Sequence, residues 1–287
     1  MLTEDLETVA SVMESAFSGI IQTLFGRLVA APIFASRMYS YRLAADPAGA
    51  LVAVAAGEVV GASFSITRGS LGWIGPIAVS PASQGQGIAQ KLMQRTIETL
   101  SARGVRLMGL ETFPTSSLHI NLYSKLGFRP AWTGISYRLQ LTAQDAPAGV
   151  ERNAGAPDLS YLYDGLDLSP DISSTLAEGV GTSLTIGRGL AIVHLEPTLW
   201  GDPDLAYALF IAAPDRETFD RLLVAVEAEA HRCGKSTVAT QVSGSSWLTQ
   251  EALRCRGYRP GSASLRMKRG EDLDYDSRPV YLCDDWH

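Results

Sequence analysis

The segment VSPASQGQGIAQKLMQRTIETL (79–100) places two glycines directly before a strongly helical pattern. Gly85 and Gly87 carry no Cβ, so they let the backbone curl and let a ligand approach it closely. The N-terminus of a helix offers several unpaired N–H groups and roughly half a positive charge. The N–H groups of residues 85–89 can therefore converge on a pyrophosphate, and the spacing predicts an anion-binding loop.

Two classes of ligand carry a pyrophosphate that fits such a loop. A dinucleotide in a Rossmann unit needs the spacing G-x-G-x-x-G after a parallel βαβ array. Gln90 occupies the third glycine position here, and a β-hairpin precedes the strand, so the dinucleotide is the less favoured alternative. Coenzyme A is the other class, and the residues around the loop favour it.

Hydrophobic spacing predicts the elements that position this loop. In chain order they are helices over 4–17 and 20–38, a hairpin over 50–67 turning at Gly57 and Glu58, a strand over 73–79, the loop, a long helix up to residue 100, a strand over 106–112, a short helix over 116–127 and a returning strand. This order predicts an α/β fold, with a mixed (α+β) sheet that carries helices on its faces.

The second half of the chain repeats the first at a shift of 130 residues. Over 104–130 there are six identities in 27 positions without a gap, where average composition gives about 2 by chance. The segment 141–157 is rich in Ala, Gly and Pro and is predicted to be the linker. We therefore expect two copies of one domain, at 1–143 and 144–287.

The second copy keeps the pattern of the fold and not the glycine loop. At this shift Pro214, Asp215, Glu217 and Phe219 stand where the first copy has Gln84, Gly85, Gly87 and Ala89, and Leu253 stands for Tyr123. If the glycines served only the turn, the second copy would need them too. The difference favours a binding site in the first copy alone.

The loop V-x-P-x-x-Q-G-x-G-I-A resembles the acetyl-CoA loop of the GCN5-related N-acetyltransferase (GNAT) superfamily, whose core pattern is Q/R-x-x-G-x-G/A. Gln84, Gly87 and Ala89 match it, and N-L-Y-S-K-L-G-F (121–128) resembles the family's second signature. The resemblance covers most of 1–140, so the whole chain resembles tandem GNAT proteins with a degenerate second copy. Family members often open with a strand, whereas this chain reaches its first helix almost at once.

The resemblance implies where acetyl-CoA would lie. Its pantetheine arm would follow the strand before the loop, bonded to the backbone of Ile77, Ala78 and Val79, in a gap where that strand splays from the next one. The pyrophosphate would rest on Gln84, Gly85, Gln86, Gly87, Ile88 and Ala89. Asn121 would contact the arm.

The resemblance also implies direct attack of a neutral amine on the acetyl thioester. Tyr123 matches the family's general acid, since a neutral phenol can donate a proton at neutral pH. Glu111, at a strand end facing the gap, is the predicted base, directly or through a water molecule; a merely solvated strand end is the alternative for it. A backbone N–H near Val79 would polarise the thioester carbonyl.

Composition narrows the class of protein. The chain has 287 residues, of which 46% are hydrophobic and 19% charged, and these values are typical of a globular protein with a sizeable core. A net charge of −6 argues against a nucleic-acid binder. Three scattered cysteines and four histidines without H-E-x-x-H spacing predict no bound metal.

The N-terminus MLTEDLETVASV lacks the order of a signal peptide. The most apolar windows, 16–35 and 50–66, are interrupted by Arg27 and Glu58, so no membrane span is expected. We expect a cytoplasmic protein.

The predicted function is an acetyl-CoA-dependent N-acetyltransferase that acts on a small-molecule or peptide amine. A non-catalytic acyl-CoA sensor or protein-interaction module on the same fold is the alternative. A third interpretation puts chemistry in both copies, and the lost loop and tyrosine of the second copy speak against it. The sequence names no particular acceptor and no oligomeric state.

Overall fold

The computed structural model describes residues 1–25, 33–198, 202–271 and 278–286. The first half contains η1 (Thr3–Asp5), α1 (Leu6–Phe25), α2 (Arg37–Ala45), η2 (Pro47–Gly49), β1 (Leu51–Ala55), β2 (Glu58–Arg68), β3 (Leu71–Val79), η3 (Pro81–Ser83), α3 (Ile88–Ala102), β4 (Leu107–Thr112), α4 (Ser117–Lys125) and β5 (Arg129–Gln140). The second contains β6 (Glu151–Arg152), α5 (Ser169–Ala177), β7 (Gly181–Ile186), β8 (Gly189–His194), β9 (Leu205–Ala213), α6 (Arg216–Arg232), β10 (Thr237–Ser243), α7 (Trp247–Cys255), β11 (Arg259–Gly270) and β12 (Tyr281–Asp284).

Most predicted elements are confirmed, and two details are wrong. The hairpin of β1 and β2 turns on Ala56 and Gly57, whose φ angles of 51° and 85° suit a two-residue hairpin turn, rather than on Gly57 and Glu58. The first helix does not stop at residue 17, because α1 continues to Phe25. The predicted second helix over 20–38 falls partly on 26–32, outside the described residues, and α2 begins only at Arg37.

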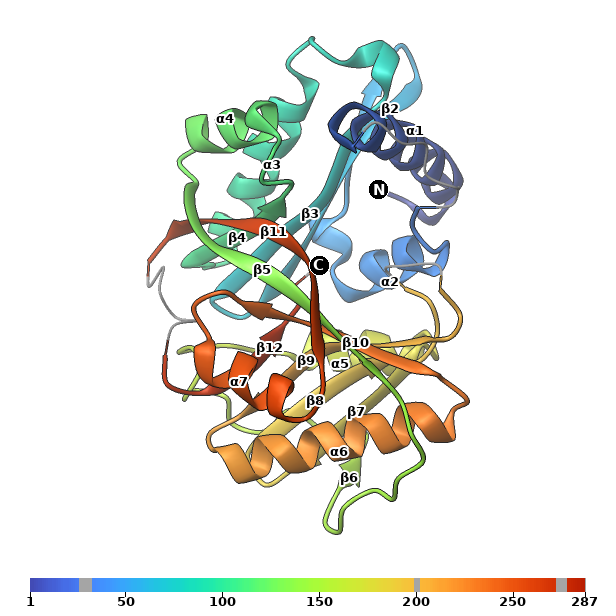
Figure 1. Cartoon of the computed structure of the whole chain (residues 1–287). Coiled ribbons are helices and arrows are strands. Elements are labelled where there is room, and N and C mark those ends of the chain that lie inside the picture. The colour runs from blue at the N-terminus through green and yellow to red at the C-terminus, as the bar shows by residue number, and fades with distance from the viewer. Residues whose placement is uncertain (26–32, 199–201, 272–277, 287) are drawn as a thin grey trace.

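The described strands form one 12-stranded mixed sheet that runs through both halves. Its order is β1-β2-β3-β4-β11-β5-β10-β9-β8-β7-β6, and β12 pairs with β9 beside this path. The predicted mixed sheet is thereby confirmed, with parallel pairs at β3–β4 and β9–β10 and antiparallel pairs elsewhere. In Figure 1 the N-terminal half lies above the C-terminal half.

The two halves exchange the strand that follows their short helix. β5 of the first half pairs with β10 of the second, and β11 of the second half pairs with β4 of the first. β5 and β11 also pair with each other, Arg138 with Arg259 and Arg129 with Lys268, so they cross the middle of the molecule side by side (Figure 1). This register repeats under the shift of 130 residues, which gives the halves an approximate two-fold relation. The predicted boundary at 143/144 falls in the coil between β5 and β6.

The equivalence of the halves is more regular than the sequence comparison indicated. α4 and α7, and likewise β5 and β11, correspond over their full lengths at a shift of 130 residues. The strand before the long helix does not: β3 spans 71–79 and its counterpart β9 spans 205–213, a shift of 134. The alignment of 73–79 with the run ending at residue 209 was therefore wrong by four residues.

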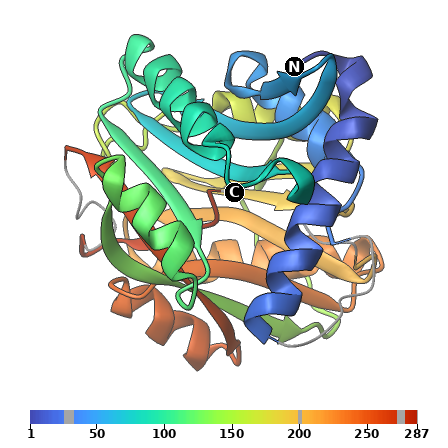
Figure 2. The ribbon, with the colours of Figure 1, turned by 90° about the horizontal axis from the view of Figure 1, so that it is seen from above.

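Helices cover the first half of the sheet on both faces (Figures 1 and 2). Side chains from α1 and α2 pack with Phe64 and Ala78 on one face, and side chains from α3 and α4 pack with Ile74 and Leu110 on the other. A further core joins the two halves, because Trp73 packs among residues of the second half such as Phe210. The site is thus built on a sheet that both halves stabilise.

The C-terminal strand β12 is buried in the second half. Its residues 281–284 pair antiparallel with 210–213 of β9, which lie beyond the last β9–β10 pair, Ala208 with Thr240. The Arg266 guanidinium, on β11, donates two bonds of 2.9 Å to the Asp284 carboxylate, and both side chains are fully buried. The acidic tail was expected to be a solvated end, and β12 shows that its last described residues instead belong to the core.

We predict that Asp284→Asn lowers the free energy of unfolding by about 3 kcal/mol, because it breaks a buried ion pair. Urea denaturation measures this change. Glu98→Gln is the control, since its carboxylate pairs with Arg95 on the exposed face of α3, and it should cost less than about 0.5 kcal/mol. Equal costs for the two variants would contradict the assigned role of β12.

Candidate active site

The glycine loop between β3 and α3 is open and exposed. Gly85 and Gly87 both have φ of 77°, a left-handed conformation that favours glycine. A Cβ added at either position would meet no other atom within 4 Å. The corner at the start of α3 is thus free of side chains, and there is room for a ligand group at the main chain.

The main chain of the loop offers a row of free donors. Within the described part of the chain, no hydrogen bond uses the N–H groups of residues 85–90 as donors, and Lys91 donates the first helical bond, to Gly87. Gly87 is the N-cap of α3 and contributes no side-chain cap. Free N–H groups at the positive end of a helix attract an anion.

Gln84 has a more limited part than expected. Its side-chain amide donates a bond of 3.0 Å to the backbone oxygen of Val79. The amide therefore ties the loop back onto the end of β3, and Gln84 offers a ligand its main chain rather than its side chain.

The second half lacks this loop altogether. Residues 80–87 separate β3 from α3, whereas only Pro214 and Asp215 separate β9 from α6. The Asp215 carboxylate caps α6 by accepting the Thr218 N–H at 2.8 Å. At this helix N-terminus a carboxylate thus lies where the first half offers free N–H groups.

Strand β3 leaves β4 in its second part, as the splay expected from the family resemblance requires. The parallel pairs between them run from Leu71–Leu107 to Ile74–Leu110 and end there. Beyond this point β3 pairs only with β2, and the Ser80 N–H bonds to the Val60 oxygen.

The direction of the main-chain groups follows from the antiparallel pairing. Bonded pairs alternate along antiparallel strands, so the main chain of Ala78 bonds to β2, and that of Ile77 and Val79 faces the open side. Of the three residues predicted to line the gap, Ile77 and Val79 therefore present their N–H groups to it.

Tyr123 lies beside this gap. It is buried on α4 and packs in one cluster with Ile74 and Leu110, the last paired residues of β3 and β4. Burial raises the pKa of the Tyr123 phenol to about 12, so it stays protonated at neutral pH. Asn121 lies two positions earlier, where the side chain is exposed on another face of the helix. The structure does not bring these two side chains together.

Glu111 lies near the end of β4, and its carboxylate is held from several sides. It accepts bonds from Arg266 Nε at 2.8 Å, from Gln241 Nε2 at 2.7 and 2.9 Å and from the hydroxyl of Ser264. All three donors belong to the second half. The side chain is 2% exposed, so the alternative of a solvated strand end is wrong. Its assignment as base stays a prediction.

His119 is a residue that the sequence analysis did not select. Its Nδ1 lies 3.4 Å from the hydroxyl of Thr112, at the end of β4, and its ring centroid lies 6.1 Å from that of Tyr123. Partial burial lowers the pKa of this imidazole, which favours its neutral form. The signal was present in the sequence, because positions four apart share one face of a helix.

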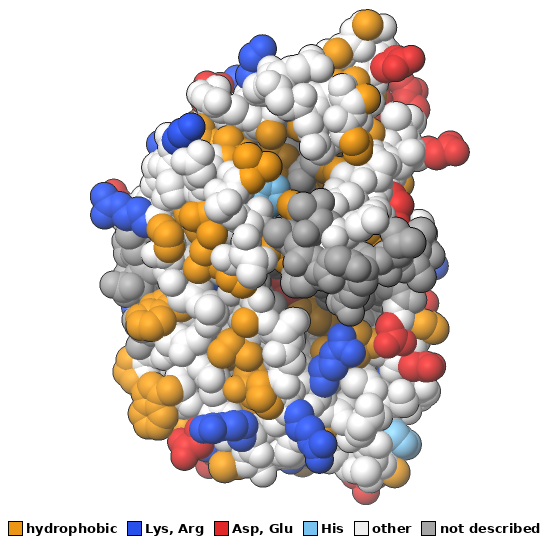
Figure 3. All heavy atoms as spheres, turned by 45° about the horizontal axis from the view of Figure 1, so that its top comes forward, with side chains coloured by type: hydrophobic (Ala, Val, Ile, Leu, Met, Phe, Trp, Pro, Cys, Tyr) orange, Lys and Arg blue, Asp and Glu red, His pale blue; other side chains and the backbone are white. Residues whose placement is uncertain are grey.

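The site opens on a concave part of the surface. Figure 3 shows hydrophobic side chains gathered around a hollow in the N-terminal half. In the described residues no group of three or more His, Cys, Asp or Glu side chains is placed to hold a metal ion. None of the helices described is both long and apolar enough to cross a bilayer.

Comparison with known proteins identifies relatives of this chain. Residues 21–128 match the model of the acetyltransferase (GNAT) family. A stretch of 52 residues is 40% identical to the [ribosomal protein bS18]-alanine N-acetyltransferase of Haemophilus ducreyi, covering 18% of this chain and 36% of that protein. The match thus spans about a third of the curated relative.

Solved structures share the fold over nearly the whole chain. A putative acetyltransferase from Pyrococcus horikoshii has a TM-score of 0.69 at 18% identity and covers 99% of this chain and 92% of its own. A GCN5-related N-acetyltransferase from Sphaerobacter thermophilus has a TM-score of 0.58 at 16% identity, covering 94% of each chain. A tandem GNAT protein from the clavulanic acid biosynthesis pathway has a TM-score of 0.54 at 14% identity, covering 93% of this chain and 95% of its own.

We predict that Glu111→Gln destabilises the fold by about 3 kcal/mol, because it weakens a buried ion pair that joins the halves. Urea denaturation and turnover, measured on the same variant, separate two roles for this residue. A structural role lowers stability and leaves kcat within a few-fold of wild type at a temperature where the variant is folded. A large loss of kcat at unchanged stability would instead support the base.

Proposed function

This chain belongs to the GNAT superfamily, and we propose that it is an acetyl-CoA-dependent N-acetyltransferase whose chemistry lies in its N-terminal half. The observation that carries the proposal is the open glycine loop at the start of α3, with free N–H groups and positive φ at Gly85 and Gly87. The corresponding corner of the second half is shortened and capped by Asp215. One anion site in two related halves is what a single catalytic domain needs.

The residues present fit coenzyme A. The loop residues 84–89 would hold the pyrophosphate through main-chain N–H groups, with no Cβ in the way at the two glycines. The exposed edge of β3, at Ile77 and Val79, would bond the pantetheine arm as an added strand does. Bound acetyl-CoA would supply an activated acetyl thioester at the mouth of the splay.

The protein's own groups would then move two protons. The Tyr123 phenol is buried and protonated, so it can donate to the departing sulfur as the C–S bond breaks. An N–H of the splayed part of β3 would bond the carbonyl oxygen as the amine attacks. The proton lost by the amine as the C–N bond forms goes to Glu111 in our proposal, directly or through water.

The second half serves as a scaffold in this proposal. Strand β12 occupies the gap between β9 and β10, and Leu253 stands at the position of Tyr123. The acceptor is a small-molecule or peptide amine, and we place the enzyme in the cytoplasm on the composition of the chain.

We predict that Gly87→Glu raises the dissociation constant of acetyl-CoA on the order of 100-fold or more, because it adds a like charge beside the pyrophosphate. Isothermal titration measures the constant. Gly104→Glu is a matched control at the other end of α3, where φ is 81° and the space is equally open, and it should bind as wild type does. If both variants bind equally well, the loop does not hold the phosphates.

We predict that Tyr123→Phe lowers kcat about 100-fold. Thiol release from acetyl-CoA with a panel of amines measures turnover. Because the pKa of Tyr123 is raised to about 12, its phenol keeps its proton at lower pH, and the wild-type rate should show no loss of this acid between pH 7 and 10. Tyr137→Phe, a buried tyrosine of β5, is the control and should stay active.

Full activity of Tyr123→Phe would remove this residue from the acid role. A wild-type protein that binds acetyl-CoA but releases no thiol with any amine would favour the acyl-CoA sensor instead.

A further inference from the structure

Arg42 is a buried cation beside the mouth of the splay. It lies on α2, is 2% exposed, and its Nη1 donates a bond of 3.1 Å to the Gly75 oxygen. Gly75 directly follows Ile74, the last residue of β3 that pairs with β4. Arg42 is thus attached to the point from which the strands diverge.

Two other buried arginines of the same region have carboxylate partners. Arg68 donates two bonds of 2.8 Å to Asp171, and Arg266 pairs with Asp284 and Glu111. In the described residues, Arg42 has no carboxylate within 4.0 Å, and its Nε has no hydrogen-bond partner. Burying an unpaired charge is costly, so such a group is usually paired with an anion.

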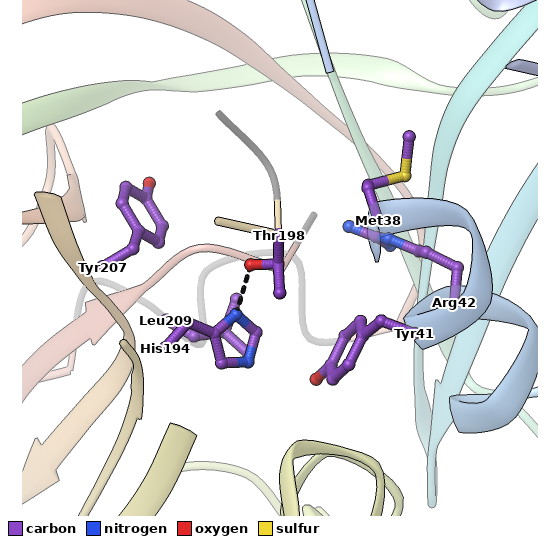
Figure 4. A pocket seen from close by; sticks show the side chains of 7 residues that line it. All are labelled: Met38, Tyr41, Arg42, His194, Thr198, Tyr207 and Leu209. Atoms are coloured by element: carbon purple, nitrogen blue, oxygen red, sulfur yellow. Dashed lines mark hydrogen bonds between the residues drawn. The ribbon is translucent and has the colours of Figure 1, made fainter. Parts of the chain in front are cut away.

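The unpaired guanidinium borders a narrow cavity between the halves. Figure 4 shows its lining, with residues of α2 facing residues of β8 and β9. The side chains that line it with Arg42 are Met38, Tyr41, His194, Thr198, Tyr207 and Leu209. The cavity is small enough to admit one chemical group of a ligand rather than a whole substrate.

None of the lining side chains supplies the missing anion. Burial lowers the pKa of His194 to about 4, and its two ring nitrogens lie within hydrogen-bond distance of the hydroxyls of Thr175 and Thr198. Burial and the neighbouring Asp285 carboxylate raise the pKa of Tyr207, so this phenol is neutral. The acids closest in charge to Arg42 are Asp171 and Asp285, and they bond to Arg68 and Tyr207.

The phosphates of acetyl-CoA cannot supply it either. In the proposed function they lie at residues 84–89, and from Gly75 to the end of β3 at Val79 the strand alone spans roughly 13 Å. The thioester end of the arm is uncharged. The remaining source of an anion at this point is the acceptor.

We propose that Arg42 binds a carboxylate of the acceptor, so that the substrate is an amino acid or another small amine that carries a carboxylate. The inference rests on the proposed N-acetyltransferase function. The narrow cavity would take the carboxylate, and the amine would face the splay mouth beside Gly75. A charge-assisted bond to guanidinium gives this class its advantage over neutral amines.

The experiment compares amines in matched pairs, the L-amino acids and their carboxamides, as acceptors in the thiol-release assay. Wild type should prefer the amino acid of a pair. Arg42→Met should raise the KM of the amino acid on the order of 10- to 100-fold and leave the carboxamide nearly unchanged. Arg37→Met, an exposed position on the same helix, is the control and should keep the wild-type preference. Arg42→Lys, which keeps the charge, should retain part of it.

The outcomes separate this inference from the proposed function. A wild type that acetylates carboxamides as well as amino acids, or an Arg42→Met variant that keeps the preference, overturns the carboxylate site while the enzyme stands. If no amine is acetylated, melting temperature gives a second readout: amino acids should raise it in wild type and not in Arg42→Met. No such shift would overturn the inference.

Discussion

The fold depends on how it satisfies the main-chain groups of a strand that diverges from its parallel neighbour. Backbone N–H and C=O groups that leave a ladder need other partners, and buried ones are rarely left without them. In the first half, Ile77 and Val79 face the open side of β3. In the second, residues 210–213 of β9 reach the same point and are paired by β12. One half satisfies the constraint with its own chain, and the other leaves it for a ligand.

This difference explains the helix N-termini as well. The second half has no ligand to bind at α6, so Asp215 can cap the helix, which stabilises it by about 1 kcal/mol. Gly87 at the start of α3 contributes no such cap. A carboxylate in its place would improve the helix and repel a phosphate, so the first half gives up local stability for an open anion site.

Local signals in the sequence predicted the parts of the site that depend on neighbouring residues. The loop, the long helix and the short helix with Tyr123 follow from glycine placement and helical periodicity, which act over a few residues. The exchange of β5 and β11 did not follow from the sequence, since a strand's pattern specifies which face is buried and not which strand it pairs with. Glu111 was placed correctly at its strand end, but its three partners come from residues 241, 264 and 266, more than a hundred positions away. The four-residue error in aligning β9 arose because the shortened loop changes the shift there from 130 to 134.

The strand exchange also limits how independent the two halves can be. Because β11 lies between β4 and β5, the carboxylate of Glu111 on β4 meets Arg266 of the other half within the sheet, and Arg266 in turn holds Asp284 on β12. The strand that closes the second half's gap is thus joined through two buried ion pairs to the strand that borders the first half's gap. A buried ion pair contributes little net stability, but removing one partner leaves an unpaired charge. The degenerate half therefore cannot be lost without disturbing the end of β4, and this physical coupling gives a reason for a second copy that has no anion loop of its own.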